Sequence, residues 1–209
     1  MEQHATSSEA SGRRVVVVHG AGREAGLGGQ LVEVVLGELE RLGAQQRLQD
    51  LLADGFDPVL RLDPEQRHAE RCSAVDDPLT HRYQEEVRWA EALVFVHPTW
   101  WFAPPAILKG WIDRVLVEDV ALAHRVGRSP QALLAGRQAL LVQTFNTRRA
   151  IDRLVFRGAS EAFWRRAVLG PCGVRLTGRV ALYSVEHLTP ARFETECRRV
   201  REAVAALVR

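Results

Sequence analysis

Three short runs of apolar residues constrain most strongly what this sequence can fold into. These runs lack the alternation of polar and apolar positions that is seen in a half-exposed strand. They are Val15–Val18, Ala92–Val96 and Ala139–Val142. Such runs are typical of strands that are covered on both faces. Strands of this kind occur in parallel sheets whose crossover helices pack on both sides. The runs therefore predict an open, parallel α/β sheet.

Segments with a helical spacing of apolar residues lie between and after these strands. We expect helices over 30–42, 79–91, 105–117 and 159–170, and a closing helix that carries the stripe Phe193, Cys197, Val200, Val204 and Leu207. Further strands are expected over 44–48 and 174–185, whereas 50–71 and a stretch of about twenty residues before 137 are expected to be loops. With right-handed crossovers, this order gives a doubly wound sheet of five parallel strands with helices on both faces. No linker or repeat divides the chain, so residues 13–209 are expected to form one domain behind a disordered tail, residues 1–12.

Composition narrows the functional classes. The 209 residues include 28 Lys and Arg against 26 Asp and Glu. The resulting net charge of +2 is too small for a protein whose main function is to bind nucleic acid. The three cysteines are odd in number and form no C-x-x-C motif, so neither a disulfide framework nor a metal site is expected. The start of the chain lacks the apolar core of a secretion signal, and no stretch approaches the ~20 apolar residues of a membrane span. We expect a cytoplasmic protein.

Ligands of open α/β sheets bind beyond the carboxyl ends of the strands, which here brings together three loops, 19–29, 97–104 and 144–149. The first loop is rich in glycine and precedes a helix, so its backbone N–H groups can approach a phosphate at the positive helix end, with Arg23 as a charged helper. A merely tight turn is the alternative. Residues 20–25 also fit the G-x-G-x-x-A dinucleotide fingerprint, but the loop continues through three more glycines instead of entering its helix at once.

The second loop carries three consecutive aromatic residues, Trp100, Trp101 and Phe102, between Pro98 and Pro104. A rigid apolar wall at the ligand edge of a sheet suits stacking on a flat ring system. The alternative is that these rings fill the core, although three bulky aromatic residues in one loop would be an unusual way to fill it.

Residues Pro98–Val115 closely resemble the run P-x-W-W-F-x-x-P-A-I-L-K-G-W-x-D-R-V of the quinone-reductase branch of the flavodoxin-like NAD(P)H oxidoreductases. Asp54–Leu60, Trp89–Phe95 and Gly136–Leu141 resemble other segments of that family, so the resemblance spans most of residues 13–209. It implies a flavodoxin-like fold with strand order 2-1-3-4-5 and a non-covalent flavin, FAD or FMN. It also implies NAD(P)H as electron donor, a quinone-like acceptor and a homodimer with the flavins near its interface.

The sequence also departs from that family. Relatives present hydroxyl and Asn side chains to the flavin phosphate, where this chain has glycines and Leu27, so backbone N–H groups would carry that task. The third loop lacks the Tyr and His with which the best-known members assist charge transfer, and it resembles instead a less-described subgroup with N-T at this place. The Asn146 amide is a candidate donor to the flavin. We hypothesise that Arg148 or Arg149 supplies the missing positive charge; the alternative is that both are solvated on the surface.

The leading hypothesis is a flavin-dependent NAD(P)H oxidoreductase that reduces quinones or related acceptors. The catalytic candidates are Asn146, Arg148 and Arg149. The cofactor-binding candidates come from the three loops and are His19, Arg23, Gly26, Leu27, Gly28, Gly29, Pro98, Thr99, Trp100, Trp101, Phe102, Thr144, Phe145, Asn146 and Thr147. Two alternatives stay open. One is a flavodoxin-like scaffold that has lost flavin and serves binding or regulation, and the other is a nicotinamide-only dehydrogenase, against which the aromatic loop argues.

Overall fold

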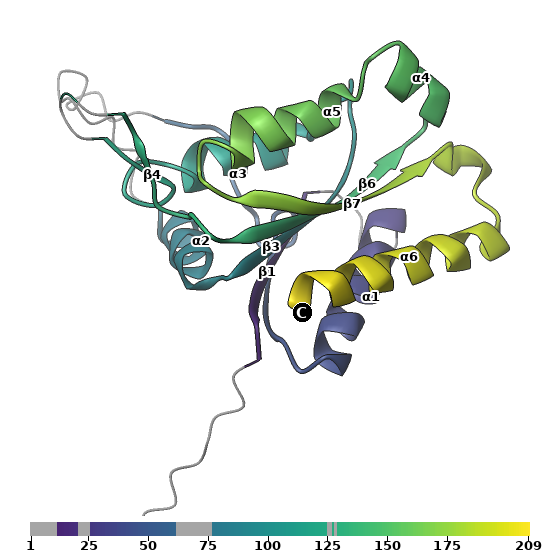
Figure 1. The fold of residues 1–209 in the computed structure, drawn as a ribbon, viewed down its shortest axis with the longest axis horizontal. Coiled ribbons are helices and arrows are strands. Elements are labelled where there is room, and N and C mark those ends of the chain that lie inside the picture. Colours follow the sequence, from purple (N-terminus) through teal and green to yellow (C-terminus); the bar gives the residue numbers. More distant parts are fainter. Residues whose placement is uncertain (1–11, 21–25, 62–76, 125–126, 128) are drawn as a thin grey trace, which may run out of the picture.

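Five parallel strands form one sheet in the order β2-β1-β3-β6-β7 (Figure 1). The computed structural model describes residues 12–20, 26–61, 77–124, 127 and 129–209. The strands of the sheet are β1 (Arg14–His19), β2 (Gln45–Asp50), β3 (Ala92–Pro98), β6 (Gln138–Phe145) and β7 (Arg175–Tyr183). The predicted order 2-1-3-4-5 is confirmed, since β6 and β7 are the fourth and fifth strands of this sheet. All carboxyl ends of the strands therefore meet at one edge.

Helices cover both faces of the sheet (Figure 1). They are α1 (Leu27–Arg41), α2 (Pro78–Trp89), α3 (Ala106–Val115), α4 (Arg149–Leu154), α5 (Ala159–Ala162), the π-helix η2 (Phe163–Leu169), the 3₁₀-helix η3 (Val185–His187) and α6 (Pro190–Val208). Helices α1 and α6 pack side by side on one face, whereas α2, α3 and η2 lie on the other. The predicted doubly wound architecture is confirmed.

The apolar runs are buried because each faces a layer of helices on both sides. Val15 and Val17 of β1 pack in the cluster with α1 and α6, while Val16 and Val18 pack in the cluster with α2 and α3. All four side chains are completely buried. This arrangement explains why the sequence shows no alternation in these strands.

Two helices begin at the residues that cap helices best. The Asp77 carboxylate accepts a hydrogen bond from the backbone N–H of Leu79 and caps α2, which has Pro78 in its first turn. The Thr189 hydroxyl oxygen accepts from the N–H of Arg192 at the start of α6. These polar groups satisfy N–H groups that have no partner inside the helix.

Several predictions of detail were wrong. The expected loop before β6 contains a small antiparallel hairpin of β4 (Leu122–Ala123) and β5 (Gln131–Ala132). Helix α4 was not predicted, and the expected helix 159–170 is one turn of α-helix followed by a π-helix.

The predicted tail, residues 1–12, lies outside the described residues except for Gly12. Among the described residues, no helix is both long and apolar enough to cross a membrane.

Candidate functional site

A cavity of about 440 Å³ lies at the carboxyl edge of the sheet. Four segments line it, and each follows a strand of the sheet. Its lining residues are Gly26, Leu27, Gly28, Pro98, Thr99, Trp100, Trp101, Phe102, Thr144, Phe145, Asn146, Thr147 and Val185. The structure thus brings together all the predicted cofactor-binding residues except His19, Arg23 and Gly29.

The aromatic loop is a tight turn anchored to β6. Trp100 and Ala103 exchange two backbone hydrogen bonds of 3.0 Å, and the N–H of Thr99 donates to the carbonyl of Thr144 over 2.9 Å. Between them, Trp101 and Phe102 both adopt the left-handed conformation, with φ of 51° and 60°. This conformation is uncommon for bulky L-residues, and such outliers cluster at ligand sites.

The rings of this loop do not fill the core. The Trp101 side chain is 97% exposed and that of Trp100 is 64% exposed. The Phe102 ring stacks on Phe156, with 3.8 Å between the ring centroids. Among the described residues, no backbone carbonyl accepts from the N–H of Trp101 or of Phe102. The turn therefore brings exposed rings to the cavity, together with two backbone N–H groups that have no backbone acceptor in the described part of the chain.

The N-terminus of α1 forms another wall of the cavity. Gly26 precedes the helix in an extended conformation, and no side chain of a described residue caps the first turn. That turn also has no acidic residue, so within the helix itself no negative charge offsets the positive end of its dipole. Free N–H groups and a positive helix end make this wall suitable for an anion such as a phosphate.

The third loop is held to the segment that follows β7. The Asn146 side-chain amide donates to Glu186 Oε1 over 2.8 Å, and the N–H of Ser184 donates to the carbonyl of Thr147 over 3.2 Å. The Phe145 ring stacks on Tyr183, with centroids 4.8 Å apart. Asn146 thus reaches the cavity with one amide hydrogen already engaged.

The remaining predicted residues lie elsewhere. His19 is buried beside β2, where its Nδ1 lies 2.9 Å from Asp50 Oδ2, and neither it nor Gly29 lines the cavity. Arg23 lies outside the described residues. Arg148 is exposed at the start of α4 and is not among the lining residues, whereas Arg149 lines a different cavity.

A buried histidine supports the floor of the site, and we did not predict it. His97 Nε2 accepts from Trp164 Nε1 over 3.1 Å and faces the Gln143 amide nitrogen at 3.2 Å. Two donors on Nε2 place the ring proton on Nδ1, which donates to the carbonyl of Pro98 over 2.6 Å. Burial, with the nearby Arg179 charge, lowers the pKa of His97 to about 4. The ring is therefore neutral at physiological pH and fixes the carbonyl of a cavity residue.

Val185 is a cavity residue that the sequence analysis missed. It comes two residues after the end of β7, at the same edge of the sheet as the three predicted loops. The rule that ligands bind beyond the carboxyl ends of parallel strands applies to this strand too. Its position in the chain was therefore the signal that would have identified it.

Comparison with known proteins agrees with the fold described above. A family model described as flavodoxin-like fold matches residues 13–207. Human ribosyldihydronicotinamide dehydrogenase (quinone) is 30% identical over 185 residues, which cover 79% of this chain and 79% of the human protein. The crystal structure of Smu.1420 from Streptococcus mutans UA159 superposes with a TM-score of 0.77 at 26% identity, covering 92% of this chain and 98% of that one. An FMN-dependent NADH-azoreductase from Bacillus anthracis, in complex with FMN, shares the fold with a TM-score of 0.72 at 16% identity over 93% of this chain and 99% of that one.

Proposed function

The chain belongs to the flavodoxin-like family, and on that premise we propose that it is a flavin-dependent oxidoreductase that takes a hydride from NAD(P)H and passes it to a quinone or a related acceptor. The human relative is a quinone dehydrogenase, which supports the proposed class of acceptor. The cavity at the carboxyl edge of the sheet would hold FMN or FAD and admit the two substrates in turn.

The composition of that cavity carries the proposal. A flavin needs a phosphate site at one end and a flat apolar surface with hydrogen-bond donors at the other. The uncapped start of α1 supplies the first, and the turn with exposed Trp100 and Trp101 supplies the second. The volume of about 440 Å³ lies within the usual range for cofactor sites, roughly 300–1,000 Å³. The residues present therefore fit the cofactor.

Each wall has a distinct task in this proposal. The N–H groups of Leu27 and Gly28 would hold the phosphate at the positive helix end. The N–H groups of Trp101 and Phe102 would donate to one edge of the flavin ring system, and the N–H of Thr147 would donate to another. When bound, the flavin supplies the chemistry of accepting and donating a hydride.

Polar side chains of the third loop would stabilise the negative charge that develops on the ring edge. Asn146 lines the cavity and keeps one amide hydrogen for this task. Arg148 does not line the cavity, but it is exposed and comes directly after Thr147, so its guanidinium would add positive charge near the ring edge. Fixed donors and charges of this kind contribute most where charge changes during the reaction. Arg149 has no part in this proposal because it lines the other cavity.

An absorbance spectrum of the purified protein tests the proposal. A flavin-binding protein is yellow, and identification of the released chromophore distinguishes FMN from FAD. NADPH and NADH are then compared as donors, with hydrophobic and hydrophilic quinones as acceptors. A colourless protein that takes up neither flavin when supplied would refute the proposal and favour the scaffold that has lost its cofactor.

We also propose that the chain forms a homodimer. Apolar side chains on and after α4 are exposed, namely Ile151, Leu154, Val155 and Phe156, with Leu154 at 79%. The stack of Phe102 on Phe156 places them beside the exposed aromatic loop. A contiguous apolar surface of this kind marks an interaction site in a soluble protein. Sedimentation velocity measurements on the purified protein test this proposal.

A further inference from the structure

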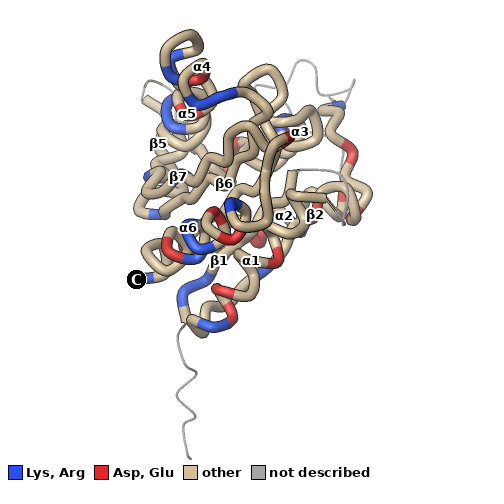
Figure 2. The backbone as a smooth tube through the Cα atoms, turned by 90° about the vertical axis from the view of Figure 1, so that its right-hand side faces the viewer, with Lys and Arg blue, Asp and Glu red and all other residues tan. Residues whose placement is uncertain are grey.

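A second cavity, of about 510 Å³, lies along the outer edge of β7, the last strand of the sheet. Basic positions occur on both α4 and α6, the helices on either side of this strand (Figure 2). Six arginines line the cavity: Arg149, Arg153, Arg165, Arg179, Arg192 and Arg199. Glu161 and Glu196 are the acidic residues in its lining, so the cavity has an excess of positive charge.

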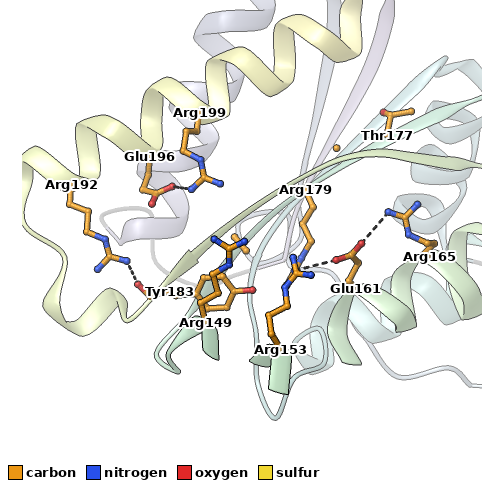
Figure 3. Close-up of a pocket in the computed structure, with 12 residues that line it drawn as sticks. Arg149, Arg153, Glu161, Arg165, Thr177, Arg179, Tyr183, Arg192, Glu196 and Arg199 are labelled. Carbon is orange, nitrogen blue, oxygen red and sulfur yellow. Dashed lines mark hydrogen bonds and ion pairs between the residues drawn. The ribbon is translucent and has the colours of Figure 1, made fainter. Parts of the chain in front are cut away.

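Four of the arginines have partners (Figure 3). Arg165 and Arg179 both pair with Glu161, over 3.1 and 3.3 Å. Arg199 pairs with Glu196 on the same helix, and Arg192 donates to the carbonyl of Tyr183. These four guanidinium groups are held in place by the fold.

Arg149 and Arg153 differ from the other four. Both come from α4, one turn apart, and both line the cavity. Within the described part of the chain, neither guanidinium has a hydrogen-bond or ion-pair partner. The lining therefore contains six arginines against two glutamates, and the two cations from α4 add repulsion that these carboxylates offset only in part.

Arg179 forms the buried base of the cavity. Its side chain is 8% exposed, its Nε donates to Gln143 Oε1 over 2.8 Å, and one terminal nitrogen lies 3.5 Å from Asp152 Oδ2. That terminal nitrogen makes no hydrogen bond within the described residues. Tyr183 donates to the same carboxylate of Asp152 over 2.6 Å, which fixes its position. A largely buried guanidinium, fixed by Gln143, Asp152 and Glu161, thus lies at the base of the cavity that Arg149 and Arg153 also line.

We propose that this cavity is a binding site for a phosphate or diphosphate group carried by a small molecule. Guanidinium groups match phosphate oxygens with paired N–H donors, and charge-assisted bonds of this kind are strong. A group with two or more negative charges offsets the excess of arginines, which a single carboxylate does not. The binding site itself does not depend on the flavin chemistry proposed above, whereas the identification of its ligand as the donor's phosphate rests on the proposed function.

The cavity has a geometric relation to the first one. Thr147 lines the first cavity and Arg149 the second, while Val185 lines the first and Tyr183 the second. The same two segments of chain therefore form walls of both. A phosphorylated ligand here is either a separate molecule or the phosphate of a dinucleotide that reaches across from the first cavity.

Calorimetric titration with inorganic pyrophosphate, on the protein saturated with FMN and again without FMN, tests the site. We expect saturable binding under both conditions, weakened about tenfold or more in the double variant Arg149→Ala/Arg153→Ala. The control is Arg198→Ala, an exposed arginine on α6 outside the cavity, which should bind as the wild type does. Because the titration does not require FMN uptake, its result can be interpreted even if the flavin proposal fails.

Three results would overturn the inference: no saturable binding, equal weakening by Arg198→Ala, or loss of binding when FMN fills the first cavity. The first of these would leave the arginines with the role of protecting an open sheet edge from pairing with another chain.

Steady-state kinetics then distinguishes the sources of the phosphate. A KM raised for NADPH but not for NADH in the double variant would support the site and identify the donor's own phosphate as its ligand. Unchanged KM values, with pyrophosphate binding lost, would support the site and identify a separate phosphorylated molecule.

Discussion

The buried His97 should make the stability of this protein fall in mild acid. Its pKa is lowered to about 4 by burial, whereas an unfolded chain has a histidine pKa near 6.5. Between these values the unfolded state binds more protons, so the free energy of unfolding rises with pH. The contribution of the neutral ring is complete above about pH 6.5 and is lost as the pH falls toward 4. Linkage gives a loss of about 2 kcal/mol between pH 7.5 and pH 5.

Urea unfolding at these two pH values measures the effect, at a fixed flavin concentration. The variant His97→Gln keeps an acceptor for Trp164 but does not titrate, so its loss on acidification should be smaller than the wild type's by about 2 kcal/mol. The matched control is His187→Gln, an exposed histidine outside the buried network, which should behave as the wild type. An equal acid dependence in the wild type and in His97→Gln would show that His97 is not the responsible group.

Three further outcomes are expected. Trp101→Ala removes a 97% exposed ring, so the free energy of unfolding should change by less than about 0.5 kcal/mol. The Kd for flavin, measured by fluorescence, should rise roughly three- to tenfold because a stacking surface is lost. An unchanged affinity would exclude stacking on this ring. Gly110→Ala places a Cβ 2.2 Å from the carbonyl oxygen of Pro58 and should cost about 1–3 kcal/mol in urea unfolding. Gly37→Ala, a helical position with nothing within 4 Å, is its control and should be neutral or stabilising. Leu154→Glu adds charge to the exposed apolar surface and should shift the protein toward monomer in sedimentation, whereas an unchanged dimer would place the interface elsewhere.

The sheet could be predicted because the burial of its strands is evident from their sequence. Each residue of Val15–Val18 faces one of two helix layers, and a strand of this kind leaves a continuous apolar run in the sequence. Helix α4 could not be predicted in this way, because Ile151 and Leu154 face outward and no core-directed stripe forms. The i→i+5 hydrogen bonding of the π-helix η2 is rare, and its buried Trp164 ring donates to His97 on β3, a contact between distant parts of the chain that local sequence does not encode.

The candidate site was predictable to the extent that it depends on strand ends. Since the carboxyl ends of parallel strands meet at one edge, the loops that contain Gly26, Trp101 and Thr144 had to lie together. Side-chain direction was not predictable. Arg149 belongs to a helix whose orientation sends it to the edge of β7, and the Asn146 amide contacts Glu186 from a distant part of the chain.

The left-handed backbone at Trp101 and Phe102 has a kinetic consequence. Holding two neighbouring L-residues in this conformation costs about 1–2 kcal/mol each, and the hydrogen bonds between Trp100 and Ala103 help to maintain it without any ligand. An incoming ring system thus meets a surface that already has its final shape and does not wait for a rearrangement. In rapid mixing, the observed association rate should rise in proportion to flavin concentration as a single phase, without levelling off.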